Sequence, residues 1–476
     1  MSLEVAPPAS GVLGGVEVEG HSIDFIPASE RHGKPSRLFF IWWSSNMQMT
    51  TVLTGVIAAA LGLTFPWAVV SIIVGLALGG VVMCLHMVQG PRLGIPQILQ
   101  SRAQFGFTGT VIPAAVAIFM YVGFFATSNL LGGQGITATL PGVPLSVGII
   151  ICAAVTAALA IFGYKEIHRW ARIWGYGFLI AFFALTISLF TRGKVPSSVW
   201  TFGKFDGGPF LLMLSIAAVW VISYAVYASD YSRYLPAEVP AHKTFWWSYA
   251  GGNLASFWLL AFGALLGVIL PKSISAMIAV TISLVGPLGV PMMFIIALGV
   301  IFTDTLNVYG ATLSLLAMTE QKRRILGIGR PSRIAVILVI SAIAAIIGII
   351  GSANFLTNYS NFLSFLFYLI IPWSAVNLVD FYLVQHGHYS TAAFFDADGP
   401  YRGVKWYAVT AYMVGFVCEI PFMSTSILTG PVAQRLNGGD LSWIVGLLVA
   451  GLLYLGFVRL GLVDRGRRSA TAEASV

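Results

Sequence analysis

Apolar stretches of about twenty residues recur along the whole chain, and short segments that carry most of the charge separate them. A helix of that length crosses the hydrocarbon core of a bilayer, whereas a transmembrane barrel would show shorter segments of alternating hydrophobicity. The pattern therefore predicts an all-α polytopic membrane protein with twelve transmembrane helices. We place them at residues 38–63, 66–89, 109–136, 143–162, 171–191, 209–228, 245–270, 287–318, 334–351, 360–384, 404–424 and 441–461.

The first span holds more hydrogen-bonding capacity than a membrane helix needs. It reads "SSNMQMTT" at 44–51, and six of these eight side chains are polar. Ser44, Ser45 and Asn46 compete for backbone groups, which favours a break in the helix. Irregular backbone at membrane depth is tolerated where it lines a cavity, so the break predicts part of a binding site. The alternative is that these small polar residues only hold neighbouring helices together.

Polar residues interrupt the sixth span in the same way, at "WVISYAVYASDY" (220–231). The first and sixth spans each open a set of five, and inverted repeats of this kind place substrate and ion sites at discontinuous helices. We expect a transporter domain at 38–461, with repeats at 38–191 and 209–384 and peripheral helices at 404–461, between cytoplasmic tails at 1–37 and 462–476.

Lys and Arg are unevenly divided between the loops on the two sides of the membrane. With the N-terminus in the cytoplasm, 21 of the 26 lie on the cytoplasmic side, and "EQKRRILGIGRPSR" at 320–333 is the densest group. This asymmetry predicts a protein of the plasma (inner) membrane with both termini cytoplasmic. It also explains the formal net charge of +8 by topology, without nucleic acid as a partner.

The composition, 57% hydrophobic and 9% charged, excludes an ordinary soluble domain. Cys84, Cys152 and Cys418 all fall in apolar segments, so we expect neither disulfides nor a metal site. His386 and His388 lie in a predicted cytoplasmic loop, and the chain shows no zinc-protease, nucleophile-elbow or phosphate-loop motif. We expect no enzyme activity, no cofactor and no obligate protein partner, which leaves the bilayer and a small-molecule substrate.

The eighth span carries an acidic residue, Asp304, close to its middle. A carboxyl group at that depth is costly and is a functional candidate by default, although neighbouring hydroxyl groups could satisfy it as a structural acid. Thr303 and Asn307 flank it and share a helix face. Glu419, the other acid within a span, lies nearer its outer end beside a proline, and we expect a structural role for it.

Aromatic and amide side chains alternate in the third span. Tyr121, Phe124 and Ser128 fall on one stripe at helical spacing, followed by Asn129, and Trp220 adds another large ring from the sixth span. Such a stripe is usually packing, but a planar heterocycle would suit it, since rings stack on its faces and amides pair with its edges.

Five motifs give the chain a resemblance to the nucleobase–cation symporters, in the purine–cytosine permease branch, over about residues 22–460. They are "IPASERHG" (26–33), "GPRLGIPQILQSRAQFG" (90–106), "FGYKEIHRWARI" (162–173), "ASDYSRYLP" (228–236) and "VDFYLVQHGHY" (379–389). The resemblance implies a leucine-transporter-like fold of two inverted five-helix repeats plus two peripheral helices. It also implies import of a nucleobase coupled to Na⁺ or H⁺.

The resemblance also assigns roles to residues. It implies substrate binding by Tyr121, Phe124, Ser128, Asn129, Trp220 and Asn307, and the polar break adds Ser45, Asn46 and Gln48 as candidates. It implies cation coupling through Ser44, Met47 and Thr303, and we add Gly299 and the mid-span acid Asp304 as further candidates.

One departure from the family pattern bears on the coupling ion. Sodium-coupled members carry two adjacent hydroxyl residues in the eighth helix, whereas this chain has Phe302 and Thr303, so one hydroxyl is missing. The Asp304 carboxyl group follows directly, which favours H⁺ over Na⁺. Two alternatives remain at this point: a carrier of another ring compound, such as a hydantoin, allantoin, uracil or thiamine, and an uncoupled facilitator or channel.

Overall fold

The computed structural model describes residues 24–140, 142–162, 164–192, 195–270, 283–318 and 330–463. Most of both predicted tails and most of the basic loop at 320–333 lie outside these ranges. Within them the protein is helical, and the one isolated β-bridge joins Ser424 and Thr429.

Every predicted span coincides with a helix or with a broken pair of helices. The long helices are α1 (Ser36–Asn46), α2 (Met49–Ala60), α3 (Phe65–Met87), α6 (Val111–Thr139), α7 (Leu145–Phe162), α8 (Tyr164–Arg192), α9 (Gly207–Ile222), α11 (Ala241–Ile269), α13 (Gly289–Met318), α15 (Arg330–Gly351), α16 (Phe355–Val379), α17 (Trp406–Glu419) and α19 (Ser442–Arg459). The short elements used below are α4 (Gln89–Leu93), α5 (Gln97–Phe105), η3 (Ser223–Tyr227), α10 (Ala228–Ser232) and η6 (Asp380–Val384).

The helix that contains the fifth predicted span begins earlier in the sequence than the span itself. The span was placed at 171–191, whereas α8 starts at Tyr164. The first two turns of α8 carry the charged and polar residues of "YKEIHRWARI", so a hydropathy pattern misses a segment that is helical but not apolar.

Six helical stretches of the described chain are long and apolar enough to cross a membrane. This supports a multi-pass membrane protein, while the count of twelve spans and the inverted repeat stay predictions. The six stretches are Phe65–Leu93, Val111–Thr139, Gly207–Ser232, Ala241–Ile269, Ser332–Val384 and Ser442–Arg459.

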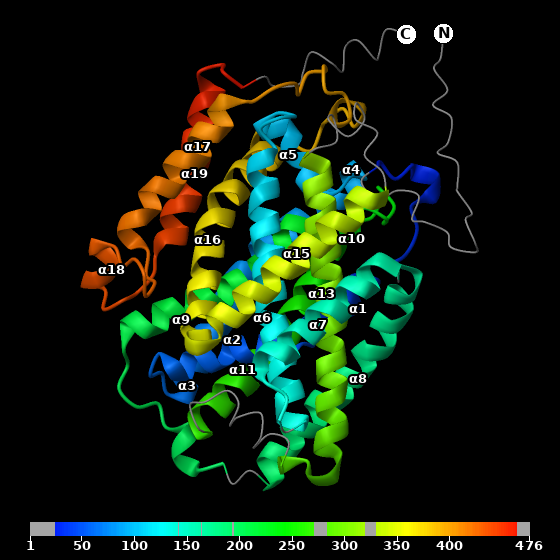
Figure 1. Ribbon diagram of the computed structural model, residues 1–476. Helices are drawn as coiled ribbons and strands as arrows, with labels where there is room; N and C mark the ends of the chain where they lie inside the picture. The colour runs from blue at the N-terminus through cyan, green and yellow to red at the C-terminus, as the bar shows by residue number, and fades with distance from the viewer. Residues whose placement is uncertain are drawn as a thin grey trace.

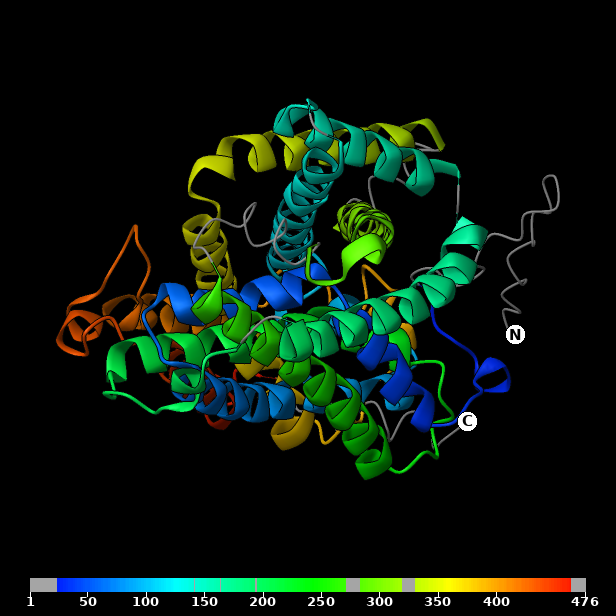
Figure 2. The ribbon, with the colours of Figure 1, turned by 90° about the horizontal axis from the view of Figure 1, so that it is seen from below.

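The helices pack into three groups. The first group contains α1, α2, α3, α9 and α11, and the second contains α6, α7, α13 and α15. The third contains α16, α17 and α19, which lie along one side of the molecule (Figure 1). Seen from below, α13 runs nearly along the line of sight with α6 beside it (Figure 2).

Glycines permit the closest helix approach in the first group. A Cβ atom on Gly55 of α2 would collide with the Leu260 carbonyl oxygen, and one on Gly263 of α11 would collide with the Val52 carbonyl oxygen. Backbones this close gain dispersion contacts, which replace the hydrophobic driving force that a lipid environment does not supply. The broken helix α1–α2 is thereby held against α11.

A buried polar network crosses one end of the molecule, where α4, α5 and α10 lie near the first and last described residues (Figure 1). Gln97 of α5 contacts the ring of His86 (3.2 Å) and accepts a hydrogen bond from Ser229 of α10 (2.7 Å). Gln104 of α5 donates to Asp380 of η6 (2.8 Å). The motif at 90–106 therefore ties the end of α3 to α10 and α16.

Candidate functional site

The first span breaks where its polar residues predicted. α1 ends at Asn46, Met47 has φ −76° and ψ 68°, and Gln48 is extended at φ −145° and ψ 157° before α2 begins at Met49. The sixth span is interrupted too, because α9 passes through the 3₁₀ turn η3 into α10. Both predicted interruptions are thus confirmed.

Asn46 is the structural centre of the first break. It is fully buried, and its Nδ2 atom donates to the carbonyl oxygen of Trp42 (2.7 Å). Its Oδ1 atom accepts from Trp220 Nε1 (2.8 Å), Tyr224 OH (3.0 Å) and Ser256 Oγ (2.7 Å). One amide thereby joins α1 to α9, η3 and α11.

Side chains also occupy the backbone carbonyls around the break. The Ser45 hydroxyl donates to Ile41 (2.8 Å), and Gln48 Nε2 donates to the Ser45 carbonyl (2.9 Å). The Thr51 hydroxyl donates to the Asn46 carbonyl (2.6 Å). The broken backbone is therefore satisfied from within the segment, as membrane depth requires.

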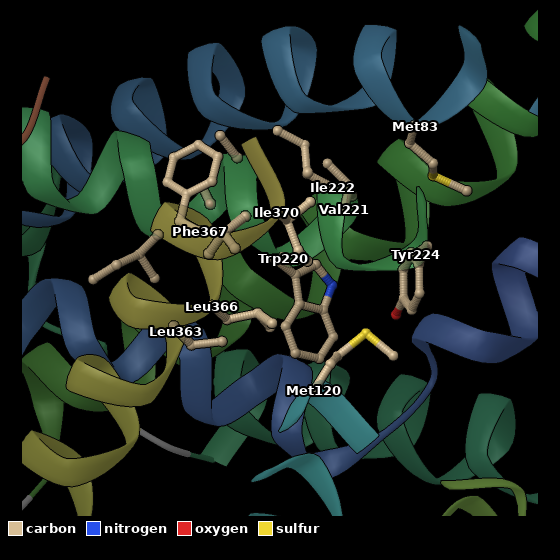
Figure 3. Close-up of a cluster of buried hydrophobic side chains, with 14 of the residues drawn as sticks. Met83, Met120, Trp220, Val221, Ile222, Tyr224, Leu363, Leu366, Phe367 and Ile370 are labelled. Carbon is tan, nitrogen blue, oxygen red and sulfur yellow. The ribbon is translucent and has the colours of Figure 1, made fainter. Parts of the chain in front are cut away.

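The Trp220 side chain is buried next to the break in the first span. It is 1% exposed, and its indole N–H is held by Asn46. Its ring meets the ring of Phe124 edge to face, with centroids 5.8 Å apart. Met120 and Leu366 also lie close around it (Figure 3). In this conformation neither Trp220 nor Asn46 is open to a substrate.

Four aromatic rings near Trp220 are only half-buried. Tyr121 of α6 stacks on Tyr227 of η3 at 5.7 Å, and Phe124 meets Phe362 of α16 edge to face at 5.2 Å. Gly123 leaves the room that the Phe362 ring fills. Gln48 reaches the Tyr224 hydroxyl, and the Tyr224 ring meets the Tyr227 ring edge to face at 5.8 Å, so these contacts link the break to the aromatic rings.

The α13 helix carries the buried carboxyl group. Asp304 is fully buried, and its Oδ1 atom accepts a long hydrogen bond from Asn307 Nδ2 (3.4 Å). Ser128 of α6 lies within hydrogen-bonding reach of the same carboxyl group, and Cys152 of α7 is close by. Asp304 Oδ2 has no hydrogen-bond partner.

The predicted coupling residues fall on two different groups of helices. Ser44 is exposed and Met47 is buried, on a segment that packs against α11. Thr303 is half-buried, and Gly299 faces the ring of Phe178 on α8. Helix α13 packs against α6, α7, α8 and α15. A joint cation site between the break and α13 therefore stays a prediction.

Several residues around the site were not found by sequence reasoning. Tyr224 and Ser256 hold Asn46, and Phe362 completes the aromatic set. Tyr359 of α16 contacts the Thr54 hydroxyl of α2 at 2.7 Å. The cluster of rings in "NYSNFLSFLFY" (358–368) was the one available signal for the two α16 residues.

Comparison with known proteins gives a consistent result over most of the chain. Residues 25–446 match the model of a family described as permeases for cytosine/purines, uracil, thiamine and allantoin. "Putative purine-cytosine permease YxlA" of Bacillus subtilis is 40% identical over 92% of this chain and 95% of its own. The purine-cytosine permease fcyB of Emericella nidulans is 24% identical over 92% and 88%. The vitamin B6 transporter TPN1 of Saccharomyces cerevisiae is 25% identical over 52% and 45%.

Solved structures agree on the fold. The inward-facing conformation of Mhp1 superposes with a TM-score of 0.77 at 18% identity, covering 92% of this chain and 93% of that one. Mhp1, which is described as a nucleobase-cation-symport-1 family transporter, also matches in a closed conformation with bromovinylhydantoin bound. There the TM-score is 0.71 at 18% identity over 91% and 93%.

Proposed function

The chain belongs to the family of permeases for cytosine/purines, uracil, thiamine and allantoin, and on that premise we propose that it imports a cytosine- or purine-type base with a cation. Transport would run by alternating access across the plasma (inner) membrane, with both termini in the cytoplasm. The observation that carries the proposal is the break at Met47 and Gln48. The helix before it packs Trp42 near Tyr227 of η3, which stacks on Tyr121 of α6.

The aromatic surface supports a flat, ring-shaped substrate. The half-buried rings of Phe124 and Tyr121 offer π-faces, and such stacking tolerates any planar base. Gln48 and Asn307 supply amide groups for the edges of the ring, since Asn307 uses only its Nδ2 atom toward Asp304. Ser45, Ser128 and Trp220 shape the surroundings, and exposure of Trp220 would need a change of conformation.

The coupling ion is proposed to act through Asp304. A carboxyl group at membrane depth with one long hydrogen bond is poorly stabilised as an anion, so it needs a proton or a metal cation beside it. The missing hydroxyl at Phe302 favours H⁺ over Na⁺, with Na⁺ as the fallback. Since Asn307 contacts the same carboxyl group, loading the cation would change how the amide meets the base.

The main alternatives concern the substrate and the coupling. A carrier of a hydantoin, allantoin, uracil or thiamine would use the same rings and amides, and the family description includes three of these four compounds. An uncoupled facilitator would share the surface but would not respond to an ion gradient.

Competitive uptake tests the substrate class. Cells that express the chain take up one radiolabelled base, and unlabelled cytosine, adenine, guanine, hypoxanthine, uracil, allantoin and thiamine compete in turn. The proposal expects cytosine or a purine to compete at the lowest concentration, and uptake to collapse when the ion gradients are dissipated. Strongest competition by allantoin or thiamine, or uptake that survives dissipation, would contradict it.

A further inference from the structure

A group of fully buried polar side chains interrupts the apolar packing of α6, α7, α13 and α15. We call it the Asn129 cluster, and it consists of Asn129, Thr156, Asp304 and Ser341, one from each helix. Apolar residues such as Ala157, Val308 and Ile340 surround it.

The packing register brings three of these side chains, Asn129, Thr156 and Asp304, to one level. Helices α6 and α13 run antiparallel, because Gly310 lies against Tyr121 and Gly132 lies against Val300. This register sets Ser128 opposite Asp304, where the two side chains are in hydrogen-bonding reach. Asn129 is the next residue along α6.

Helix α7 closes the other side of the cluster. Gly132 lies against the Cys152 sulfur atom, and Ile149 lies against both Gly133 of α6 and Gly348 of α15. Gly348 also lies against the Ala126 carbonyl oxygen and Leu130 of α6, so α15 reaches the level of Ser128 two turns beyond Ser341. Thr156 is one turn beyond Cys152, which is itself close to Asp304.

Five polar atoms of this cluster are buried without a hydrogen-bond partner. They are Asn129 Nδ2 and Oδ1, Thr156 Oγ1, Asp304 Oδ2 and Ser341 Oγ. An unsatisfied buried polar atom costs roughly 1–3 kcal/mol, so several in one place indicate a group that binds there.

The charge around the cluster favours a cation as that group. Helices α6, α7 and α13 carry no Lys, Arg or His, and α15 carries only Arg330 and Arg333 at its start. Among the described titratable side chains, Cys152 lies near Asp304, whereas Arg333 lies over the Tyr309 ring (5.4 Å). No cationic side chain in these four helices therefore balances the carboxyl group.

We propose that the Asn129 cluster binds the coupling monovalent cation, at the Oδ2 atom of Asp304 and between α6, α7 and α13. This site would lie between other helices than a joint site with the broken helix, and the proposal rests on the coupled transport proposed above. If the cation is H⁺, it binds Oδ2 and is donated to Asn129 Oδ1 or to the Ser128 hydroxyl. If it is Na⁺, the carboxylate, the amide oxygen and the hydroxyl oxygens are its ligands.

The two oxygen atoms of the Asp304 carboxyl group would then have different roles in coupling. Oδ2 holds the cation, while Oδ1 orients Asn307, whose amide faces the base. A cation bound on one side of α13 would thereby strengthen base binding on the other side without direct contact between the two.

An isosteric variant of the distant hydroxyl residue Thr156 tests the site. Base binding to purified protein in nanodiscs is titrated with Na⁺ at fixed pH, and with pH in the absence of Na⁺. Thr156→Val should raise the Na⁺ concentration for half-maximal binding about tenfold, or shift the pH midpoint by about one unit, because the site loses one ligand or hydrogen bond. The titration in which base binding changes, with Na⁺ or with pH, identifies the coupling ion.

Matched variants separate this site from its rivals. Thr305→Val removes a buried hydroxyl of α13 that bonds only to its own helix at Ile301, and it should leave the ion dependence unchanged. Thr156→Ser should restore the wild-type midpoint. The proposal is overturned if Thr156→Val leaves the midpoint within twofold of wild type, or if Thr303→Val alone shifts it. Absence of any base binding by the wild-type protein would instead contradict the proposed function.

Discussion

Replacing Asn46 with alanine removes the group that holds the first helix break to its surroundings. The variant deletes the hydrogen bond from Asn46 Nδ2 to the Trp42 carbonyl. It also removes the acceptor that Trp220, Tyr224 and Ser256 share, all of them buried. Three donors from three other elements are then left without the partner around which they are arranged.

The expected loss of stability follows from these contacts. A buried donor without an acceptor costs about 1–3 kcal/mol, and the Tyr224 and Ser256 hydroxyls can rotate toward other acceptors, whereas the indole N–H of Trp220 cannot. We therefore expect a loss of about 3–5 kcal/mol. For a chain of 476 residues, this corresponds to a melting temperature lower by roughly 3–5 °C.

The assay compares Asn46→Ala with Ser45→Ala in thermal melts of the purified protein in detergent. Ser45 is the control because its hydroxyl bonds only within α1, to Ile41, so its loss should cost about 1 kcal/mol or less. Base transport by Asn46→Ala should fall as well, since the break loses its anchor. If Asn46→Ala melts no lower than Ser45→Ala, the amide is not the centre of the break and this reasoning is wrong.

Three further variants test other parts of the account. Trp220→Ala should weaken base binding roughly 5- to 150-fold at normal surface expression, the value of one stacking contact, and unchanged affinity would remove Trp220 from the site. Cysteines placed in 320–333 should react with an impermeant reagent only from the cytoplasm, and cysteines near Lys204 or Arg435 only from outside; labelling of the basic loop on intact cells would overturn the proposed topology. Asp380→Ala should lower the melting temperature, because Gln104, Tyr389 and Tyr454 all donate to that carboxyl group, and an unchanged melt would show that the network adds no stability.

The position of the helix break could be predicted from the sequence, and the roles of its residues could not. Ser44 to Thr51 are polar in a span that should be apolar, so the interruption is a local property of the chain. The function of Asn46 depends on Tyr224 and Ser256, which lie 178 and 210 residues away. No local pattern reports such distant partners.

Distant partners were equally unpredictable in the second group of helices, α6, α7, α13 and α15. Asp304 was recognisable as a functional candidate because a carboxyl group is rare at membrane depth. Asn129 was assigned to the substrate through the family resemblance, whereas the structure buries it in the packing of α6 with both polar atoms unpartnered. Only the register between α6, α7 and α13 brings Thr156 to the same level as Asp304.

Gradient-driven uptake in proteoliposomes tests the central claim most directly. Wild-type protein and Asp304→Asn, which mimics the neutral acid, are compared for accumulation of a labelled cytosine or purine base under an inward H⁺ gradient and, separately, an inward Na⁺ gradient. The account predicts that wild-type protein concentrates the base under one of the two gradients, while Asp304→Asn exchanges base across the membrane but does not concentrate it. Accumulation by Asp304→Asn equal to wild type under the same gradient would contradict the coupling role of Asp304 and make it a structural residue.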